Sequence, residues 1–262
     1  MIEDRHLVWS SGGGVQSTAI AVLIAQGKIP KPECVVMADT GREASETWAY
    51  NKTHVAPVLA SVGLSLEIIP HSTSKNDLYH KGLTLLPAFV FYGGEAFGHP
   101  EKFGRLRNFC SGKWKCDVVT RYLLSKGYGR KRPCSQILGF SVDEERRAKL
   151  PRCQWLIHTF PLIELGMTRT DCVSVVREAG LPTPPRSSCW MCPHRKNAEW
   201  RRLREFYPDE WAQACRLDEE IRQSDPKHGV FLHRDRKPLS ECNIDLDGAA
   251  CGESCESGLC FV

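Results

Sequence analysis

The stretch Ser10-Ser11-Gly12-Gly13-Gly14-Val15-Gln16-Ser17 decides the fold, because it joins an apolar run to a segment of helical length. The run Leu7-Val8-Trp9 is typical of a short buried strand, and residues 17–26, followed by Gly27, are typical of a glycine-capped helix. Glycines at such a junction let the backbone approach a ligand, and a helix N-terminus favours an anion. The spacing matches neither a Walker A loop nor the G-x-G-x-x-G of dinucleotide sites. We therefore predict a phosphate-binding loop of another class, with a ligand-free turn as the alternative.

Alternating strands and helices continue after this loop. Residues 33–41 contain a second strand that ends in a polar turn, residues 43–59 are typical of a helix, and residues 64–69 of a third strand. This order predicts an α/β fold with a doubly wound, mainly parallel sheet. Ligands of such sheets bind beyond the carboxyl ends of the strands, so we expect Asp39-Thr40-Gly41 and the glycine loop at one edge.

The middle of the chain is less regular. Residues 71–109 contain scattered glycines and few periodic apolar residues, which favours a loop over the site or a substrate-binding excursion. We expect a helix from about Lys113 and a strand over residues 135–140. The acidic and basic residues 143–147 follow that strand, so they are expected at the same edge.

The C-terminal half is predicted to be mostly helical. The segment Thr168-Arg169-Thr170-Asp171 is expected to supply an N-cap for a helix over residues 172–179. Residues 197–223 are typical of one long amphipathic helix. We predict a nucleotide-binding domain over residues 1–160, a helical part over 161–240 and a cysteine-rich tail over 241–262.

Composition narrows the class of protein. The chain has 262 residues, of which 42% are hydrophobic and 25% charged, as in ordinary globular proteins. A net charge of +4 does not by itself indicate nucleic-acid binding, although local basic clusters would suit a polyanionic partner as well as a solvated face. The N-terminal residues have no signal-peptide pattern and no apolar run has membrane-spanning length, so we expect a cytoplasmic protein without a membrane partner.

Three blocks now occur in a fixed order: the glycine loop, Asp39-Thr40-Gly41 with Glu46-Thr47 behind it, and residues 139–147. With Pro161-Leu162-Ile163 and Cys189-x-x-Cys192 they cover almost the whole chain. The chain thus resembles the phosphoadenosine phosphosulfate (PAPS) reductase family of the adenine nucleotide α-hydrolase, or PP-loop, superfamily. It departs from that family in a third glycine, in Gln16 where aspartate is common, and in lacking the Glu-Cys-Gly tail of the PAPS-reducing members.

The resemblance implies that ATP is cleaved between its α- and β-phosphates, so that a substrate is adenylated and pyrophosphate leaves. The loop would hold the phosphates, residues 37–41 would flank adenine and ribose, and Mg²⁺ would bridge phosphate oxygens. Arg146 or Arg147 would meet phosphate charge. The implied catalytic residues are Gln16, Ser17, Asp39 and Arg146, and the implied nucleotide-binding residues are Ser10, Ser11, Gly12, Gly13, Gly14, Ser17, Met37, Asp39, Thr40, Gly41, Gly139 and Arg147.

Thirteen cysteines in a reducing compartment favour metal or redox chemistry over disulfides. Cys34, Cys172 and Cys215 lie in apolar segments and are expected to pack. Cys189-x-x-Cys192 has the spacing of a metal-ligand pair, which leaves a [4Fe–4S] cluster, a structural zinc ion and a thiol redox pair or simple packing as alternatives. The expected further ligands are Cys110 as the third and Cys116 as a fourth or a bystander.

These features favour an ATP-dependent sulfur-transfer enzyme that thiolates a nucleic acid (tRNA or DNA) or a nucleotide with the help of an iron–sulfur cluster. One alternative is a sulfonucleotide reductase with Cys260 as nucleophile, and another is an inactive nucleotide-binding module marked by Gln16. Cys251, Cys255 and Cys260 would relay a persulfide or resolve a disulfide, or would have no role. The expected partners are an adenine nucleotide, a nucleic acid, an undetermined sulfur donor and a second copy of the chain in a homodimer.

Overall fold

The computed structural model describes residues 5–70, 75–80, 83–94, 99–149, 151, 153–224 and 229–246. The chain divides into two compact units, each built from two separate segments. Unit 1 comprises Met1–His71 and Trp114–Ser188, and unit 2 comprises Ser72–Lys113 and Cys189–Val262. These boundaries differ from the expected ones, because residues 161–188 belong to unit 1 and residues 72–113 to unit 2.

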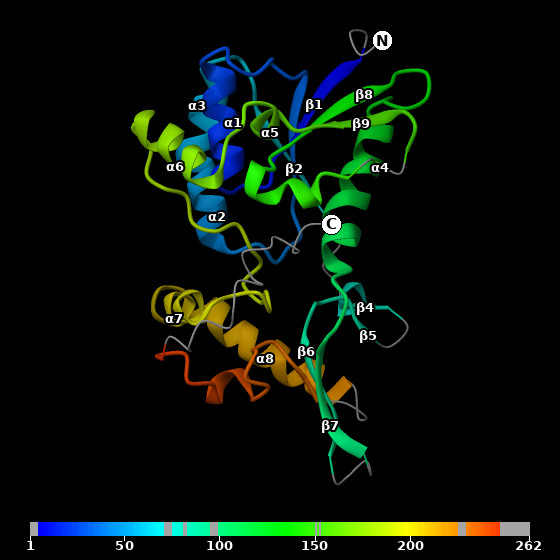
Figure 1. Ribbon diagram of the computed structural model, residues 1–262, viewed down its shortest axis with the longest axis vertical. Coiled ribbons are helices and arrows are strands. Elements are labelled where there is room, and N and C mark those ends of the chain that lie inside the picture. Colours follow the sequence, from blue (N-terminus) through cyan, green and yellow to red (C-terminus); the bar gives the residue numbers. More distant parts are fainter. Residues whose placement is uncertain are drawn as a thin grey trace. The chain divides into compact units, whose positions relative to one another are not determined.

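Unit 1 contains a five-stranded parallel sheet in the order β3-β2-β1-β8-β9 (Figure 1). The central strand aligns Trp9 with Val35 on one side and with Ile137 on the other. The parallel α/β fold expected from the sequence is thereby confirmed, although β9 was not foreseen. The strands are β1 His6–Ser10, β2 Cys34–Ala38, β3 Leu66–Ile69, β8 Cys134–Leu138 and β9 Leu156–Thr159.

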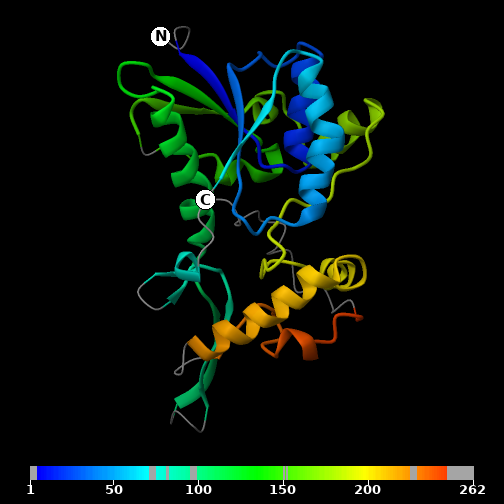
Figure 2. The same cartoon turned by 180° about the vertical axis from the view of Figure 1, so that it is seen from behind.

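Helices cover both faces of this sheet (Figures 1 and 2). Alternate strand residues point to opposite faces, so Trp9 packs with α1, α3 and α6, whereas Val8 packs with α4. Every residue of α1 from Val15 to Ile24 is buried, because the sheet covers one side of this helix and α3 and α6 pack against its other sides. The helices are α1 Val15–Ala25, α2 Ser45–Tyr50, α3 Ala56–Ala60, α4 Asp117–Ser125, α5 Pro161–Glu164 and α6 Arg169–Glu178.

The helix expected over residues 43–59 is interrupted. A π-helical turn, Asn51–Val55, separates α2 from α3. Pro57 follows this turn. Proline has no backbone N–H to donate to the preceding helical turn, and its ring clashes with the carbonyl of the residue four positions earlier. By contrast, the cap expected within residues 168–171 is confirmed, although α6 begins earlier than expected, at Arg169. The Thr168 side chain accepts from the Asp171 backbone while Asp171 accepts from the Thr168 backbone.

Unit 2 contains a three-stranded antiparallel sheet in the order β10-β6-β7. The expectation of a loop over residues 71–109 is therefore wrong for the part that the structure describes, whereas a substrate-binding role of this segment stays a prediction; residues 71–74, 81–82 and 95–98 lie outside the described part. The charged strand β7 has no apolar alternation of its own and owes its regularity to pairing with β6. The strands of this sheet are β6 Phe89–Gly94, β7 His99–Arg105 and β10 Gly229–Phe231, and a separate two-stranded antiparallel sheet is formed by β4 Tyr79–His80 and β5 Leu83–Thr84.

Two helices, α7 Asn197–Phe206 and α8 Pro208–Ser224, replace the single long helix expected over residues 197–223. The break is at Tyr207, whose φ of −135° and ψ of 61° lie outside the helical region. The cause is Pro208, because a proline disfavours helical geometry in the residue before it. Trp200 of α7 and Trp211 of α8 pack edge to face, with ring centroids 6.2 Å apart. Within the described ranges, no helix has both the length and the apolar character needed to cross a membrane.

Candidate functional site

The direction in which the sheet of unit 1 is built reverses between β1 and β8. From β1 the chain adds β2 and β3 on one side, and later β8 and β9 on the other. In open α/β sheets, ligands bind beyond the carboxyl ends of the strands at such a switch point. The glycine loop follows β1, Asp39-Thr40-Gly41 follows β2 and Gly139 follows β8, so the structure brings the three expected segments to one edge.

Gly13 is the residue of the loop whose lack of a side chain the fold requires. Its φ is +74°, a left-handed conformation that other residues rarely adopt. A Cβ atom here would lie 2.7 Å from Cε of Met37 and 3.1 Å from Nδ2 of Asn51. The Asn51 amide in turn donates to the carbonyls of Gly13, at 3.1 Å, and Thr47, at 2.8 Å. Gly12 is exposed, and the nearest described atom to its Cβ position is Oγ of Ser17 at 3.6 Å.

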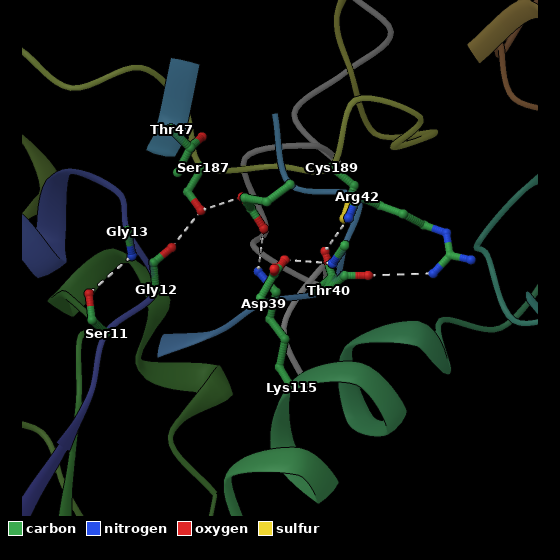
Figure 3. A network of polar contacts seen from close by, with 12 residues as sticks. Ser11, Gly12, Gly13, Asp39, Thr40, Arg42, Thr47, Lys115, Ser187 and Cys189 are labelled. Carbon is green, nitrogen blue, oxygen red and sulfur yellow. Dashed lines mark hydrogen bonds and ion pairs between the residues drawn. The ribbon is translucent and has the colours of Figure 1, made fainter. Parts of the chain in front are cut away.

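The first turn of α1 suits an anion. Two N–H groups of the preceding loop already have partners. The Gly12 N–H donates to Oγ of Ser17 at 2.8 Å. The Gly13 N–H donates to Oγ of Ser11 at 3.2 Å (Figure 3). Among the described residues, no side chain caps the helix at Gly14, and the first turn has no acidic residue. The positive end of the helix dipole thus has no anionic side chain of its own helix beside it.

Gln16 lies at the centre of a polar chain that links α1 to the segment after β8. Its Nε2 donates to Oε2 of Glu144 at 3.0 Å, and its Oε1 accepts from Nη1 of Arg169 at 3.2 Å. Glu144 also pairs with Arg147, whose guanidinium lies 4.5 Å from the centre of the Phe140 ring. An aspartate at position 16 could accept from Arg169 but could not donate to Glu144, which gives a physical reason for the amide.

Gly139 lets β8 pass close to α1. A Cβ atom on it would lie 3.3 Å from Cδ1 of Ile20 and 3.5 Å from Cβ of Gln16. The 3₁₀ turn that follows, Val142–Arg147, carries both candidate arginines. Arg147 is buried, whereas Arg146 is exposed. Of these two residues, Arg146 is therefore the one with a guanidinium accessible to a ligand at this edge.

The turn after β2 is held by its own side chains. Oδ1 of Asp39 accepts from the Gly41 N–H at 2.6 Å, and Oγ1 of Thr40 accepts from the Arg42 N–H at 3.2 Å (Figure 3). Thr40 is fully buried, Asp39 is half-buried, and Gly41 has a φ of +65°. Thr40 thus shapes the turn, and Asp39 has a second carboxylate oxygen beyond the one that Gly41 holds.

Ser187, Glu43 and Lys115 complete the edge, and sequence reasoning did not select them as site residues. The Ser187 hydroxyl hydrogen-bonds the Gly12 carbonyl and lies 2.8 Å from Oε1 of Glu43, whose Oε2 is 3.2 Å from Nζ of Lys115 (Figure 3). The Glu43 side chain is completely buried, and Lys115 neutralises it. Their positions in the sequence could have indicated two of them. Glu43 follows Asp39-Thr40-Gly41 closely, and Ser187 lies just before Cys189.

Three buried polar atoms near the loop lack a hydrogen-bond partner within the described part of the chain: Oγ1 of Thr47, Oδ1 of Asn51 and Oγ of Ser188. Buried polar atoms are rarely left in this state, because the loss of solvation is costly. A polar ligand or ordered water in their neighbourhood would satisfy them.

The candidate cluster ligands are distributed over both units. Cys110, Cys189 and Cys192 belong to unit 2, and Cys116 belongs to unit 1. The Cys192 N–H donates to the Cys189 carbonyl at 3.1 Å, which closes a tight turn between the two thiols. Joint ligation by Cys110, Cys189 and Cys192 stays a prediction, and Cys251, Cys255 and Cys260 lie outside the described residues.

A different group of side chains in unit 2 has the geometry of a metal site. One ligand atom from each of His233, Asp235 and Cys242 lies within 4.8 Å of the others, so this group could hold a metal ion. Sequence reasoning missed it, because only the His-x-Asp spacing is local and Cys242 looked like part of the cysteine-rich tail.

Of the three thiols expected in packing, Cys172 is buried, and Cys34 and Cys215 are half-buried. Burial raises the pKa of Cys172 to about 12 and that of Cys215 to about 11, and it also raises the pKa of Cys34. Cys172 of α6 is fully buried in the same apolar cluster as residues of α1, which confirms its packing role.

Arginines from three of the local basic clusters, Arg105 with Arg107, Arg130-Lys131-Arg132 and Arg201-Arg202, stack on aromatic rings. The guanidinium carbons of Arg105 and Arg132 lie 4.7 Å and 4.3 Å from the ring centres of Phe89 and Tyr128. Arg202 lies 5.2 Å from the centre of the Phe206 ring. These arginines have a structural use besides any polyanionic partner.

No protein-family model matches the chain, and no curated protein gives a significant match.

Proposed function

We propose that the chain is an ATP-dependent enzyme of the PAPS-reductase type that adenylates an acceptor, releases pyrophosphate and supports sulfur transfer to a nucleic acid or nucleotide. The observation that carries this proposal is the meeting of the glycine loop, the Asp39 turn and the Gly139 segment at the switch point between β1 and β8. The nearby orphan polar atoms of Thr47, Asn51 and Ser188 support a polar ligand there.

In this proposal the loop and the first turn of α1 hold the phosphates. The helix dipole and the N–H groups of the first turn, rather than those of the loop, favour charge that develops on leaving pyrophosphate, since the N–H groups of Gly12 and Gly13 already donate to Ser17 and Ser11. An acceptor oxygen attacks the α-phosphorus, and Arg146, exposed in the turn after β8, contacts phosphate oxygens. Oδ1 of Asp39 is held by Gly41, so Oδ2 is the oxygen that would contact phosphate-bound Mg²⁺.

The cysteines would serve the second half of the reaction. Cys189 and Cys192 lie in one turn, as a ligand pair requires, and Cys110 is in the same unit. A [4Fe–4S] cluster held by these thiolates would supply a site for the sulfur that displaces AMP from the adenylated acceptor. A zinc ion at the same pair would instead have a structural role.

The test is an anaerobic assay of ATP turnover with tRNA, DNA and small acceptors, which separates pyrophosphate from orthophosphate as product. We expect pyrophosphate and AMP with at least one acceptor. Arg146→Ala should lower this activity by about 10- to 100-fold if the guanidinium contacts the phosphates. Arg121→Ala is the matched control, because Arg121 is also an exposed arginine of unit 1 but lies on α4.

Formation of ADP and orthophosphate would contradict α–β cleavage. ATP binding without turnover on any acceptor would favour the inactive module, and sulfite release from PAPS that depends on Cys260 would favour the reductase. Iron and acid-labile sulfide in anaerobically purified protein, lost in Cys189→Ser, test the cluster separately.

A further inference from the structure

His233, Asp235 and Cys242 form a compact ligand set on the segment that follows β10. Nδ1 of His233 lies 3.5 Å from Oδ2 of Asp235, and Sγ of Cys242 is within 4.8 Å of both. Bonds from a tetrahedral zinc ion to its ligands are roughly 2.0–2.3 Å long. This geometry places a nitrogen and an oxygen ligand about 3.3 Å apart, and it places a sulfur ligand about 3.6 Å from either of them. The nitrogen–oxygen pair therefore already has nearly the spacing of one edge of a zinc tetrahedron.

The hydrogen bonds around His233 leave its inner nitrogen as the one with a lone pair. Nδ2 of Asn197 donates to the carbonyls of Asn243, at 3.4 Å, and Leu246, at 2.6 Å, so Oδ1 is the amide atom 3.0 Å from Nε2 of His233. An amide oxygen only accepts, so Nε2 carries the proton. Nδ1 accepts from the Asp235 N–H at 3.2 Å, which agrees with this tautomer.

This arrangement is the one that metal-binding histidines usually have. Their second ring nitrogen donates to an oxygen, which fixes the ring and leaves the other nitrogen for the metal. Asn197 supplies that oxygen here, and its orientation is fixed in turn by two backbone carbonyls. Nδ1 is the ring nitrogen that faces Asp235, as ligation requires.

The backbone that carries the ligands is held at both ends. The buried carboxylate of Asp218 accepts from the Leu232 N–H at 2.7 Å and from the Leu239 N–H at 2.9 Å, and so clamps residues 232–239. Within the described ranges, Arg236 is the one residue other than glycine with a positive φ, +53°. Its N–H closes a turn on the His233 carbonyl at 3.1 Å, and this turn directs Asp235 back toward the imidazole. Such a backbone conformation is costly and occurs often at ligand sites.

Burial differs among the ligands in a way that suits an ion entering from solvent. His233 is 1% exposed and Cys242 8% exposed, whereas the Asp235 side chain is 44% exposed. The thiol of Cys242 points to the carbonyls of Pro238, at 3.4 Å, and Lys237, at 3.6 Å. An ion can therefore reach the two buried ligands past the accessible carboxylate.

We infer that unit 2 binds one divalent ion of the zinc class through Nδ1 of His233, the Asp235 carboxylate and the Cys242 thiolate, with the fourth position open to water. The Cys242 thiol gives up its proton to solvent as the metal–sulfur bond forms, and the ion displaces the hydrogen bond between the Asp235 N–H and Nδ1. One nitrogen, one oxygen and one sulfur ligand favour zinc over harder ions such as Mg²⁺. This site shares no residue with the candidate cluster at Cys110, Cys189 and Cys192.

The test is a titration of the full, chelator-treated chain with Co²⁺, whose absorption reports thiolate ligation, followed by displacement with Zn²⁺. It is run on the wild-type chain and on the Cys189→Ser/Cys192→Ser variant, so that the two sites are counted separately. In the Cys189→Ser/Cys192→Ser background we expect one ion with a thiolate-to-cobalt band, and the substitutions that follow are made in that background. Cys242→Ser should abolish this band, and Asp235→Asn should weaken binding at least about 10-fold while leaving the fold intact, because Asp235 is exposed.

Two matched controls lie in the same unit. Cys215→Ser changes a half-buried thiol of α8, and Asp245→Asn changes an exposed carboxylate that pairs with Arg204; neither should alter binding. The inference is overturned if the wild-type chain shows no thiolate band, or if Cys242→Ser and Asp235→Asn bind Co²⁺ with unchanged spectrum and affinity. It is also overturned if the whole thiolate signal disappears in Cys189→Ser/Cys192→Ser.

Discussion

Replacement of Gly13 by alanine tests whether the loop is held as closely as the structure indicates. The left-handed conformation of Gly13 should cost an alanine about 1–2 kcal/mol. The added methyl group would also lie 2.7 Å from Cε of Met37 and 3.2 Å from Cγ2 of Thr47. The end of a methionine side chain can move, but Met37 is 2% exposed and Thr47 is fully buried, so we expect a further packing cost of about 1–3 kcal/mol.

Gly27 provides the matched control for the conformational part of this cost. Its φ is +71°, almost that of Gly13, but no described atom lies within 4 Å of its Cβ position. Gly27→Ala should therefore cost only about 1–2 kcal/mol, and Gly13→Ala about 2–5 kcal/mol, in free energy of unfolding measured with urea. Gly12→Ala should be near neutral, within about 0.5 kcal/mol, because the φ of Gly12 is not in the left-handed region and its Cβ would make only an ordinary contact, 3.6 Å from Oγ of Ser17.

The difference between Gly13→Ala and Gly27→Ala isolates the packing of the loop against Met37, Asn51 and Thr47. Equal losses in the two variants would refute the close approach, since the loop could then relax away from these residues at no cost. A loss in Gly12→Ala as large as that in Gly13→Ala would also refute it, because the structure assigns the restraint to one glycine.

Three further predictions concern unit 1. Gln16→Asp should lower the free energy of unfolding by about 1–3 kcal/mol, because it places a second carboxylate beside Glu144. In a double-mutant cycle, Glu144→Gln should recover part of this loss. Additive losses would contradict the contact between the two side chains. Burial raises the pKa of the Cys172 thiol from 9.0 to about 12. Between pH 9 and pH 12 the thiol therefore keeps its proton in the folded chain and loses it in the unfolded chain. The free energy of unfolding should therefore fall by up to about 1.4 kcal/mol per pH unit in that range, and Cys172→Ala should reduce the slope of a urea-unfolding series measured against pH. Thr168→Ala should cost about 1 kcal/mol by removing the cap of α6, whereas Thr170→Ala, an exposed change in the same turn, should cost less in the same urea experiment; equal costs would count against the cap.

The parts of the fold that were predictable are those whose signal is local. The strand, glycine loop and helix around Gly13 follow each other without interruption, and the carboxyl edge follows from the order of the parallel strands. β9 is short and carries polar residues, and β7 is charged, so both depend on partner strands that lie elsewhere in the chain. The break between α7 and α8 did have a local signal in Pro208, which the amphipathic pattern on both sides obscured.

The residues of the candidate site also divide into those with a local sequence signal and those whose contacts come from distant parts of the chain. Ser187 meets Gly12 across 175 residues and Glu43 across 144, and no periodicity reveals such a contact. A buried glutamate is nevertheless costly without partners, so Glu43 fixes what must surround it: a cation, which Lys115 supplies, and a hydroxyl, which Ser187 supplies. Long-range chemistry of this kind becomes visible only when the fold shows which charges are buried.

Gln16 shows how such a contact changes the meaning of a sequence departure. From the sequence alone, Gln16 suggested an inactive module, because proteins of the PAPS-reductase type commonly have an aspartate at this position. In the structure, position 16 lies between a carboxylate and a guanidinium, and an amide can donate to Glu144 while it accepts from Arg169. An aspartate would satisfy Arg169 and repel Glu144. The amide is therefore accounted for by its neighbours in the fold, so Gln16 does not by itself argue for an inactive module, and Arg146, exposed in the turn after β8, becomes the more informative residue for testing activity.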